Sequence, residues 1–521
     1  MAIIGIVICD IETWDEGAKQ IRFAPLNKIQ ILILYIKISV YLMIQSLIHS
    51  TEYGNVYLYD DMHMLSLLVH PELKKVCENS ENVDPYYLKK YKYLKKYGFF
   101  DIPKSAEFGK VNERMVEEGI INVPQILFEV TDLCNLNCTY CGYGELYEVL
   151  DIRNKNNIDL NNALIFLEYI LSLKLKCKKS RLAIGFYGGE ALLNIEFIRQ
   201  IVDKVKSLNY KNEMDIQYSM TTNATLIDRC IDFLVENKFD INISLDGNRE
   251  NHSYRIFRGS NKSSFDKVIE NTDMIFEKYP NFFDKHVNFI SVLHNRNSIK
   301  SIYEFINNRY HKIPIIVELA TKDVSPDKKN VIKEMFHNKR ESENEYLKET
   351  SDIISKVYSN SSIHNELKDF VKCYSVNYYL SNLTSLLIKK DKYYPTSTCL
   401  PLARKIFLTT HNKLLPCEKV NYKYCMGSVN GKVQIDIPKI TKMYAHYYEI
   451  LEKVCRNCFA YKFCGLCMYH IENLDKLDTE EFICERFYDK NRFGEKLYRV
   501  FSYLEKHPKA IFQILEDTEI K

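Results

Sequence analysis

The feature that most constrains the fold is a regular alternation of strand-like and helix-like segments between residues 122 and 320. Short apolar runs are expected to be strands, and amphipathic segments that fit helices lie between them. Repeated strand–helix units of this kind form a parallel sheet or barrel. The predicted strands are Gln125–Thr131, Leu182–Tyr187, Asp215–Thr222, Asp240–Asp246, Val287–Leu293 and Ile313–Leu319, and the predicted helices are Asn161–Lys174, Asn194–Ser207, Leu226–Asn237, Ser264–Lys278 and Ile299–Asn308.

The charge and the cysteine content narrow the classes of function. The chain has 521 residues, enough for two or three domains, and its formal net charge of +3 argues against a nucleic-acid-binding protein. No basic stretch precedes the short apolar run after Met1, so we expect no secretory signal and predict a cytoplasmic protein. In a reducing cytosol, clustered cysteines bind metal or do redox chemistry rather than form disulfides.

One apolar segment, Ile29–Ile48, is about long enough to cross a membrane. It is interrupted by Lys37 and by several polar residues, and a lysine in mid-span costs about 2.5–3.5 kcal/mol on insertion. We therefore expect a buried helix here instead of a membrane span.

Ten of the sixteen cysteines fall into two clusters. The first, with the spacing C-x3-C-x2-C, follows the first predicted strand and comprises Cys134, Cys138 and Cys141. Three thiolates can hold three irons of a cubane cluster and leave the fourth iron open to a chelating small molecule. The alternative is a structural zinc site, although zinc usually takes four ligands in paired C-x2-C units. The scattered cysteines, Cys9, Cys77, Cys177, Cys230 and Cys373, are expected to be small buried hydrophobes.

The second cluster has seven cysteines, which is more than one metal site needs. Two C-x2-C pairs within it resemble zinc half-sites, but the gap of five residues between them is much shorter than in a zinc ribbon. The glycines nearby predict a loop-rich metal domain. The cluster comprises Cys399, Cys417, Cys455, Cys458, Cys464, Cys467 and Cys484, and Cys425 lies within its span.

At the first cluster the sequence resembles the radical S-adenosylmethionine (radical SAM) superfamily, whose motif has this spacing and an aromatic residue, here Tyr140, before the last cysteine. The resemblance covers roughly residues 122–320. It implies an α/β fold in the form of a partial (β/α)6 TIM-type barrel. It also implies a 4Fe–4S cluster on Cys134, Cys138 and Cys141, with S-adenosylmethionine as the second cofactor.

Further matches to the superfamily stand at the ends of predicted strands, where barrel enzymes place their chemistry. Glu190 resembles the residue that accepts from the methionine amino group, although a helix-capping Glu after a strand-ending turn fits the same sequence. Arg255, which follows His252, would pair with the methionine carboxylate, and Arg258 is close enough to be the true counterpart. The residues that the resemblance assigns to S-adenosylmethionine are Tyr140, Gly188, Gly189, Glu190, Asn223, Ser244, Asp246 and Arg255.

The second cluster resembles the SPASM extension, which carries auxiliary iron–sulfur clusters in many peptide-modifying radical enzymes. The resemblance implies two auxiliary 4Fe–4S clusters. Two residues separate Cys464 from Cys467 where the family usually has three, so the sorting of ligands stays open, and Cys425 is a candidate additional ligand. The implied sorting gives Cys399, Cys417 and Cys467 to one cluster and Cys455, Cys458, Cys464 and Cys484 to the other.

We divide the chain into a small α+β unit (1–115), the radical SAM barrel (122–322), a solvated helical connector (323–395), the SPASM domain (396–490) and a C-terminal helix (491–521). In the first unit, Gly54–Tyr59 predicts a strand, and Pro85–Phe100 predicts a helix capped by Asp84 and ended by Gly98. This order is compatible with the winged-helix module that binds the leader of precursor peptides in related maturases. It is equally compatible with a domain that merely packs on the barrel.

Together these features predict a radical SAM enzyme that cross-links or oxidises a ribosomally made precursor peptide with the help of an external electron donor. The alternative within this chemistry is an anaerobic sulfatase-maturating enzyme, which forms formylglycine. Those enzymes usually carry Asp after the second SPASM cysteine, where this chain has Glu418. A third alternative is a non-catalytic peptide-binding protein, against which the intact three-cysteine motif argues. No catalytic acid or base is identified.

Overall fold

The centre of the molecule is a ten-stranded sheet with the order β13-β12-β11-β10-β4-β5-β6-β7-β8-β9. The structure is a computed structural model and describes residues 47–516 apart from 62–64, 79, 81, 98–107, 149–152, 154, 176–180, 210–213, 350–360, 375–392, 472–473 and 480–481. Strands β4 to β9 are parallel, and β10 adds to β4 in parallel, whereas β10 to β13 pair in antiparallel fashion. The strand order leaves β9 and β13 as the two edges, so the predicted α/β fold with an unclosed parallel sheet is confirmed.

The six parallel strands lie where the sequence predicted them. A helical connection follows each of the first five, and such crossovers are what allow neighbouring strands to run in parallel. The strands are β4 (Gln125–Thr131), β5 (Arg181–Gly188), β6 (Asp215–Thr222), β7 (Asp240–Ser244), β8 (Val287–Leu293) and β9 (Ile315–Glu318).

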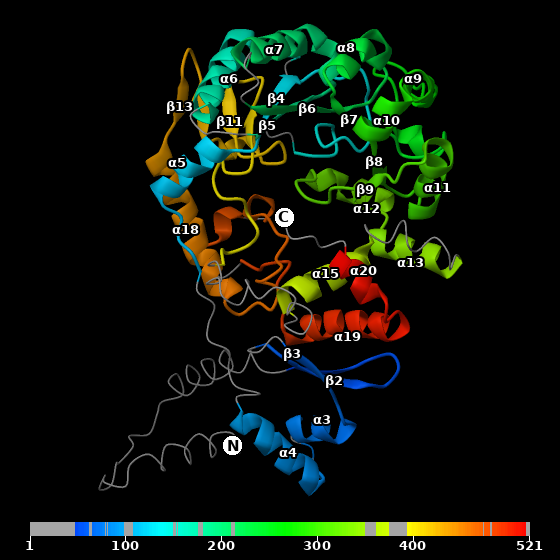
Figure 1. Cartoon of the computed structure of the whole chain (residues 1–521), viewed down its shortest axis with the longest axis vertical. Helices are drawn as coiled ribbons and strands as arrows, with labels where there is room; N and C mark the ends of the chain where they lie inside the picture. Colours follow the sequence, from blue (N-terminus) through cyan, green and yellow to red (C-terminus); the bar gives the residue numbers. More distant parts are fainter. Residues whose placement is uncertain are drawn as a thin grey trace.

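The predicted helices between the strands are also present, and they cover the outer face of the sheet (Figure 1). Each presents an apolar stripe at helical spacing; α7, for example, buries Phe197, Ile201 and Val205 against the sheet. The helices around the parallel strands are α5 (Glu113–Asn122), α6 (Leu160–Lys174), α7 (Ile195–Leu208), α8 (Ile231–Glu236), α9 (Phe265–Lys278), α10 (Pro280–His286) and α11 (Ile299–Tyr310).

The C-terminal part of the chain extends the same sheet beyond β4. Short strands β10 (Ile406–Leu408), β11 (Lys413–Leu415), β12 (Gly427–Val429) and β13 (Val433–Ile435) lead into the long helix α18 (Ile437–Cys455). Because β10 pairs with β4, the segments that carry the second cysteine cluster are attached directly to the strand that precedes the first one.

The N-terminal unit is an antiparallel sheet of β1 (Leu47–Ser50), β2 (Val56–Asp60) and β3 (Leu65–Val69), followed by two helices. The predicted strand corresponds to β2, and the predicted helix to α4 (Pro85–Lys96), which follows α3 (Pro71–Cys77). The Asp84 carboxylate accepts from the Tyr86 amide at 2.8 Å, as expected for a helix cap, while the predicted stop at Gly98 lies outside the described residues.

A second hydrophobic core joins the N-terminal sheet to helices from the other end of the chain. Leu47 and Tyr59 pack with residues of α15 (Ser362–Tyr374), α19 (Lys490–Lys506) and α20 (Ala510–Glu516). Figure 1 shows the β1–β3 sheet directly below α19, with the ten-stranded sheet at the opposite end of the molecule. The N-terminal sheet therefore docks on the C-terminal helices.

One expectation differs from the structure, and another is largely untested. The stretch expected to be a solvated connector contains α12 (Lys329–Met335), α13 (Lys339–Glu349) and α15, and α15 is not solvated because its apolar face is buried in the second core. Of the segment Ile29–Ile48, for which a buried helix was predicted, the last two residues belong to strand β1, and the rest lies outside the described residues. No helix within the described ranges is long and apolar enough to cross a membrane.

Candidate functional site

Segments that follow four neighbouring strands meet at the carboxyl edge of the parallel sheet. The Glu190 amide, after β5, donates to the Leu133 carbonyl, after β4, at 2.8 Å. Tyr140, in the cysteine loop, donates its hydroxyl to Asp246, after β7. The structure therefore brings together the motifs that the sequence placed at strand ends.

The first cysteine loop is held by its backbone. The Asn137 and Thr139 amides donate to the carbonyls of Ile256 and Tyr254 at 2.8 and 3.1 Å, and Arg258 Nε donates to the Cys134 carbonyl at 2.9 Å. Residues 254–258, which follow β7, thus hold the cysteine loop by hydrogen bonds along its length. Arg258, the alternative to Arg255 in the sequence, is one of the side chains that hold the loop.

The three thiols of this loop lie close together and are partly buried. Burial raises the pKa of Cys134 to about 11 and that of Cys138 to about 12, and in both cases the neighbouring Cys141 thiol adds to the rise. The Cys134 sulfur accepts from the Leu136 amide at 3.4 Å, a contact that favours a thiolate.

Gly188 and Gly189 are required by the close approach of β5 to the cysteine loop. A Cβ atom on Gly188 would lie 2.2 Å from the Thr131 carbonyl oxygen, and Gly188 has a φ of +141° that other residues rarely adopt. A Cβ atom on Gly189 would lie 2.0 Å from the Leu133 carbonyl oxygen. Both glycines therefore fit the loop and the strand end together.

Glu190 caps the turn that follows. Its carboxylate accepts from the Leu192 amide at 3.1 Å, from the Thr222 hydroxyl at 2.7 Å and from the Asn223 amide at 2.8 Å, and the side chain is 1% exposed. Burial raises the pKa of Glu190, and these three donors oppose the rise. A carboxylate has about four acceptor positions, so these three donors leave one of them unused. The capping role considered from the sequence is thus present in the structure.

Asn223 joins the end of β6 to the cysteine loop. Its side-chain amide donates to Asn135 Oδ1 at 2.9 Å, and its side-chain oxygen accepts from the Thr225 amide at 3.0 Å. Ser244 is the last residue of β7 and is half-buried. Both predicted residues thus lie at the carboxyl edge, next to the loop or to Asp246.

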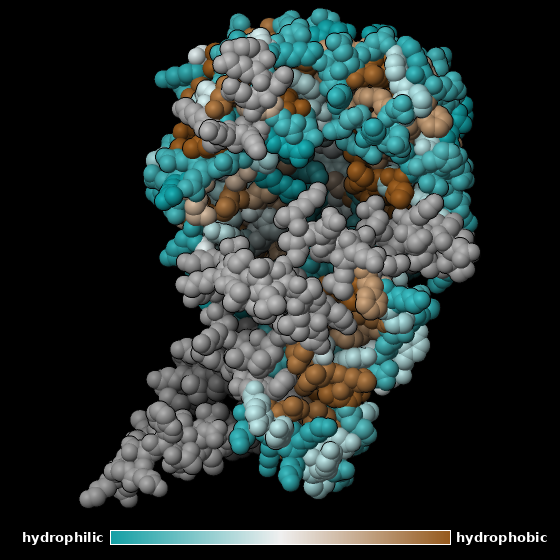
Figure 2. Space-filling model, viewed as in Figure 1, coloured by the Kyte–Doolittle hydropathy of each residue, from teal (hydrophilic) through white to brown (hydrophobic). Residues whose placement is uncertain are grey.

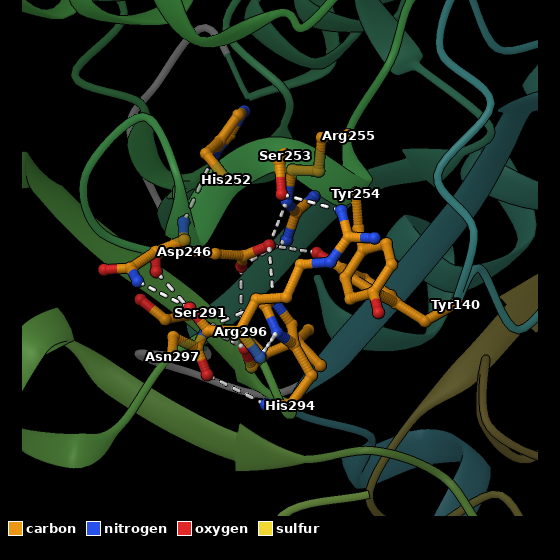
Figure 3. Close-up of polar contacts among 12 residues, drawn as sticks. Tyr140, Asp246, His252, Ser253, Tyr254, Arg255, Ser291, His294, Arg296 and Asn297 are labelled. Carbon is orange, nitrogen blue, oxygen red and sulfur yellow. Dashed lines mark hydrogen bonds and ion pairs between the residues drawn. The ribbon is translucent and has the colours of Figure 1, made fainter. Parts of the chain in front are cut away.

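Asp246 is the centre of a buried charge network (Figure 3). Arg255 donates to both carboxylate oxygens, at 2.9 and 3.0 Å, and the Val292 amide donates at 2.9 Å. Burial alone would raise the pKa of Asp246, but the Arg255 guanidinium holds it well below its usual range. His252 accepts from the Asp246 amide at 3.4 Å and contacts the Ser264 hydroxyl at 3.0 Å.

This geometry bears on the role predicted for Arg255. The sequence assigned its guanidinium to the methionine carboxylate, but in the structure two of its nitrogens are occupied by Asp246. Arg255 is 7% exposed, and its charge is neutralised by the one partner. A guanidinium has five N–H donors, of which Asp246 takes two, and the assignment of Arg255 to the methionine carboxylate stays a prediction.

Sequence reasoning missed the residues that follow β8. His294, fully buried, lies 3.9 Å from the Asp246 carboxylate, and its ring is 5.6 Å from that of Tyr140. The Asn297 side-chain amide donates to the Asp246 carbonyl at 3.3 Å and lies 3.1 Å from His294 Nε2. Their position after the fifth parallel strand was the available signal, because residues there point to the same edge as those after the other strands.

A second missed group lies on the face of β4 opposite its covering helices. Glu129, 1% exposed, accepts from Arg153 at 3.2 Å, from the Thr410 amide at 3.1 Å and from the Tyr422 hydroxyl at 2.9 Å. Arg153 also lies 3.4 Å above the ring of Tyr143. This group connects the segment after the first cysteine loop with the β10–β11 region that carries Cys417.

Four cysteines of the second cluster gather at the end of α18. Burial raises the pKa of Cys455 to about 12, and the nearby thiols of Cys458, Cys464 and Cys484 add to the rise. The Cys458 sulfur accepts from the Ala460 and Tyr488 amides, both at 3.3 Å. These four are the cysteines that the family pattern assigns to one auxiliary cluster, despite the short gap in the sequence.

The remaining cysteines are less tightly grouped. Burial raises the pKa of Cys467, with the Cys399 thiol contributing, so these two are neighbours. Cys417 contacts Glu418, which is paired with Lys405 at 2.9 Å. Cys425 is exposed and donates to the Gly427 carbonyl. Of the scattered cysteines, Cys230 is buried as predicted, whereas Cys77 and Cys373 are only half-buried, and Cys9 and Cys177 lie outside the described residues.

The donor set fits iron–sulfur clusters. Every residue in the two groups presents a thiol, the soft ligand that such clusters take, and backbone amides point at the sulfurs of Cys134 and Cys458. Within the described part of the chain, no three Cys, His, Asp or Glu side chains stand close enough to hold one metal ion. In a cubane each iron takes its own thiolate, so the ligands stand farther apart than around a single ion.

Comparisons with known proteins agree with this geometry. Residues 128–306 match the family model described as the radical SAM superfamily. The chain is 25% identical over 386 residues to the cysteine-type anaerobic sulfatase-maturating enzyme of Clostridium novyi, covering 72% of this chain and 94% of that one. It is 27% identical over 216 residues to the radical SAM cyclopropyl synthase TigE of Paramaledivibacter caminithermalis, covering 40% of this chain and 42% of that one.

Among solved structures, native anSMEcpe with bound AdoMet aligns with a TM-score of 0.49 and 20% identity over 75% of this chain and 99% of that chain. The family match spans β4 to α11 and includes the cysteine loop, the two glycines and Asp246. The chain therefore contains a radical SAM domain, which spans residues 128–306.

Proposed function

We propose that this protein reductively cleaves S-adenosylmethionine and uses the resulting radical to cross-link or oxidise a ribosomally made precursor peptide. The observation that carries the proposal is the cysteine loop itself. Cys134, Cys138 and Cys141 lie together at the carboxyl edge of a radical SAM domain, beside Asp246 and the Gly188–Glu190 turn. Members of this superfamily use a 4Fe–4S cluster and S-adenosylmethionine.

The three thiolates would hold the cluster and leave one iron open. When bound, the cluster supplies the electron that splits S-adenosylmethionine into methionine and a 5′-deoxyadenosyl radical. Tyr140, Asn223, Ser244 and the remaining acceptor position of Glu190 would orient the cofactor. Asp246, held by Arg255, fixes the ring of Tyr140 in the cysteine loop, so the loop and the cofactor site are aligned by one network.

The second cysteine cluster supports a peptide as substrate. Cys455, Cys458, Cys464 and Cys484 would hold one auxiliary cluster, and Cys399, Cys417 and Cys467 the other. Such clusters would accept the second electron of an oxidation, and an external donor would supply the first. Glu418, which follows Cys417 and pairs with Lys405, lies near Tyr187 of β5 and would face the substrate.

Anaerobic reconstitution with iron and sulfide, followed by dithionite and S-adenosylmethionine, tests the proposal. We expect 5′-deoxyadenosine from the wild-type protein and only the background of a protein-free mixture from Cys134→Ala. Cys230→Ala, which removes a buried cysteine outside both clusters, should retain the activity. Equal 5′-deoxyadenosine from wild type and Cys134→Ala would refute the assignment.

Sulfatase maturation is the second candidate, and the relative from Clostridium novyi favours it because the similarity covers 94% of that enzyme. The two outcomes differ by mass. A cross-link removes about 2 Da from a precursor peptide, whereas conversion of a sulfatase-type cysteine to formylglycine removes about 18 Da. Mass spectrometry of both peptides after one reaction decides between them, and modification of the sulfatase peptide alone would overturn the first candidate.

We also propose that the N-terminal unit binds the leader of the peptide by strand addition. In the described residues β3 pairs with β2 alone, and Leu68 on this strand is 65% exposed. Hydrophobic residues gather on the visible face over this sheet (Figure 2). The adjacent α4 carries five lysines and no acidic residue, so an acidic leader fits best. A precursor without its leader should then bind more weakly than the full peptide.

A further inference from the structure

The Cys458–Cys464 loop is enclosed by segments that lie far from it in the sequence. Phe459 stacks on Phe493 of α19, with ring centroids 5.0 Å apart and an interplanar angle of 12°. The Tyr374 hydroxyl, from α15, donates to the Phe459 carbonyl. Phe463 packs edge-on against Tyr374 at 5.3 Å. The wall of the four-cysteine site is therefore built from both α15 and α19.

The N-terminal sheet contributes a charged residue, Asp61, to the same wall. Lys462, in the middle of the loop, pairs with Asp61 at the end of β2 at 2.8 Å, and the two side chains are 6% and 7% exposed. The Tyr59 hydroxyl donates to the same Asp61 oxygen at 2.8 Å. The Lys462 ammonium also lies 5.1 Å from the ring centroid of Tyr374 and 5.5 Å from that of Tyr461. Asp61 is thus the carboxylate partner of a cation placed between two cysteines.

A buried ion pair of this kind constrains both partners. Removal of one member leaves the other charge buried without compensation, which is strongly unfavourable, whereas replacement of both by apolar residues is often close to neutral. The position of Lys462 is therefore tied to that of Asp61, about 400 residues away in the chain. Lys462 in turn belongs to the short loop that spaces Cys458 from Cys464.

We propose that Asp61 is a positioning residue for the four-cysteine site: it acts through Lys462, and the N-terminal sheet completes the housing of that auxiliary cluster. This inference rests on the proposed iron–sulfur function. It adds that the unit proposed to bind the leader is joined to an auxiliary cluster through one ion pair. By linkage, a change that weakens the docking of the N-terminal sheet also weakens the binding of the cluster. Loss of the cluster weakens the docking of the sheet in turn.

The two charges should affect the reduction potential in opposite directions. Reduction adds an electron to the cluster, so a nearby positive charge favours it and a nearby negative charge opposes it. Asp61→Asn leaves Lys462 uncompensated and should raise the potential. Lys462→Met removes the cation and should lower it. A variant that only loosened the fold would move the potential in the same direction for both substitutions.

The experiment uses the full chain, with Cys134, Cys138 and Cys141 changed to Ala so that the first cluster is absent. After anaerobic reconstitution, the potential of the signal that disappears in Cys455→Ala is measured by redox titration with electron paramagnetic resonance. Iron loss to a chelator and limited proteolysis of the N-terminal unit are followed in parallel. We expect opposite potential shifts for Asp61→Asn and Lys462→Met, and iron loss on the order of tenfold faster in each. The wild-type potential should return in Asp61→Glu.

Matched controls separate this effect from general damage. The exposed pair Arg181–Asp215, on the ten-stranded sheet, should change neither potential nor iron loss when Asp215 is replaced by Asn. The double variant Asp61→Leu with Lys462→Met should retain iron better than either single variant. Equal potentials and iron loss in wild type and both single variants would overturn the positioning role while leaving the proposed function intact. Wild-type protein that holds no iron would instead overturn the proposed function.

Discussion

The two cysteine regions are organised in different ways. The first loop is held by backbone hydrogen bonds to the segment after β7 and by a buried charge network, all within residues 131–297. The second group is held by aromatic rings and one ion pair from the N-terminal sheet, α15 and α19. The first site should therefore form wherever the parallel sheet folds, whereas the second requires parts of the chain that lie hundreds of residues apart.

The largest test of this contrast is the substitution Asp246→Asn. It leaves the Arg255 guanidinium buried without its carboxylate, so we expect a loss of about 3–5 kcal/mol in the free energy of unfolding. The loss should fall on the domain that holds the first loop. Denaturant unfolding, followed by circular dichroism, measures this free energy. At denaturant concentrations below the unfolding transition, limited proteolysis of the N-terminal unit should be the same as in the wild type.

The matched control is Asp266→Asn, which breaks an ion pair with Arg249 that is exposed on both sides. Exposed pairs contribute about 0–1 kcal/mol, so this variant should unfold close to the wild type. If Asp246→Asn and Asp266→Asn unfolded alike, the buried network would not be what holds the first site.

An intermediate effect is expected from acid at the interface that supports the second region. His49 on β1 is 7% exposed, and neither ring nitrogen has a hydrogen-bond partner among the described residues. Burial lowers the pKa of His49 to about 4; the Glu505 carboxylate opposes this shift and the Lys74 ammonium adds to it. The folded chain therefore prefers neutral His49. Its contribution is complete above the unfolded pKa of about 6.5 and is lost progressively towards pH 4, by about 3 kcal/mol.

Proteolysis of the N-terminal unit as a function of pH measures this loss. As the pH falls from 6.5 to 4, the N-terminal unit should become more sensitive to proteolysis. The variant His49→Phe, whose side chain cannot be protonated, should show a flatter dependence of proteolysis on pH. The first cysteine loop lies far from His49 and should keep its protection over this range. An identical pH profile for wild type and His49→Phe would show that this histidine does not link the interface to pH.

The same contrast explains what could be predicted from the sequence. Strand ends and cysteine spacing are local patterns, so β4 to β9, the Cys134–Cys141 loop and the turn at Gly188–Glu190 were found in the right order. The pairing of Arg255 with Asp246 was not predicted, because a motif does not show which partner within the protein a charge has. Glu129 with Arg153 and Asp61 with Lys462 were missed because each pair is created by tertiary contact, without a sequence pattern that links its members.

The smallest effect is expected at α4, which buries none of its side chains and supports neither cysteine region. Asp84→Ala removes the cap on the Tyr86 amide and should cost about 1 kcal/mol of helix stability, felt as fraying of the first turn. Hydrogen exchange of the α4 amides measures this directly, with Asp84→Ser, which can still cap, as the control. Because α3 separates α4 from the strands that contact α19, the potential of the four-cysteine cluster should not move. A shift there as large as that of Asp61→Asn would mean that the coupling passes through the whole N-terminal unit and not through the single ion pair.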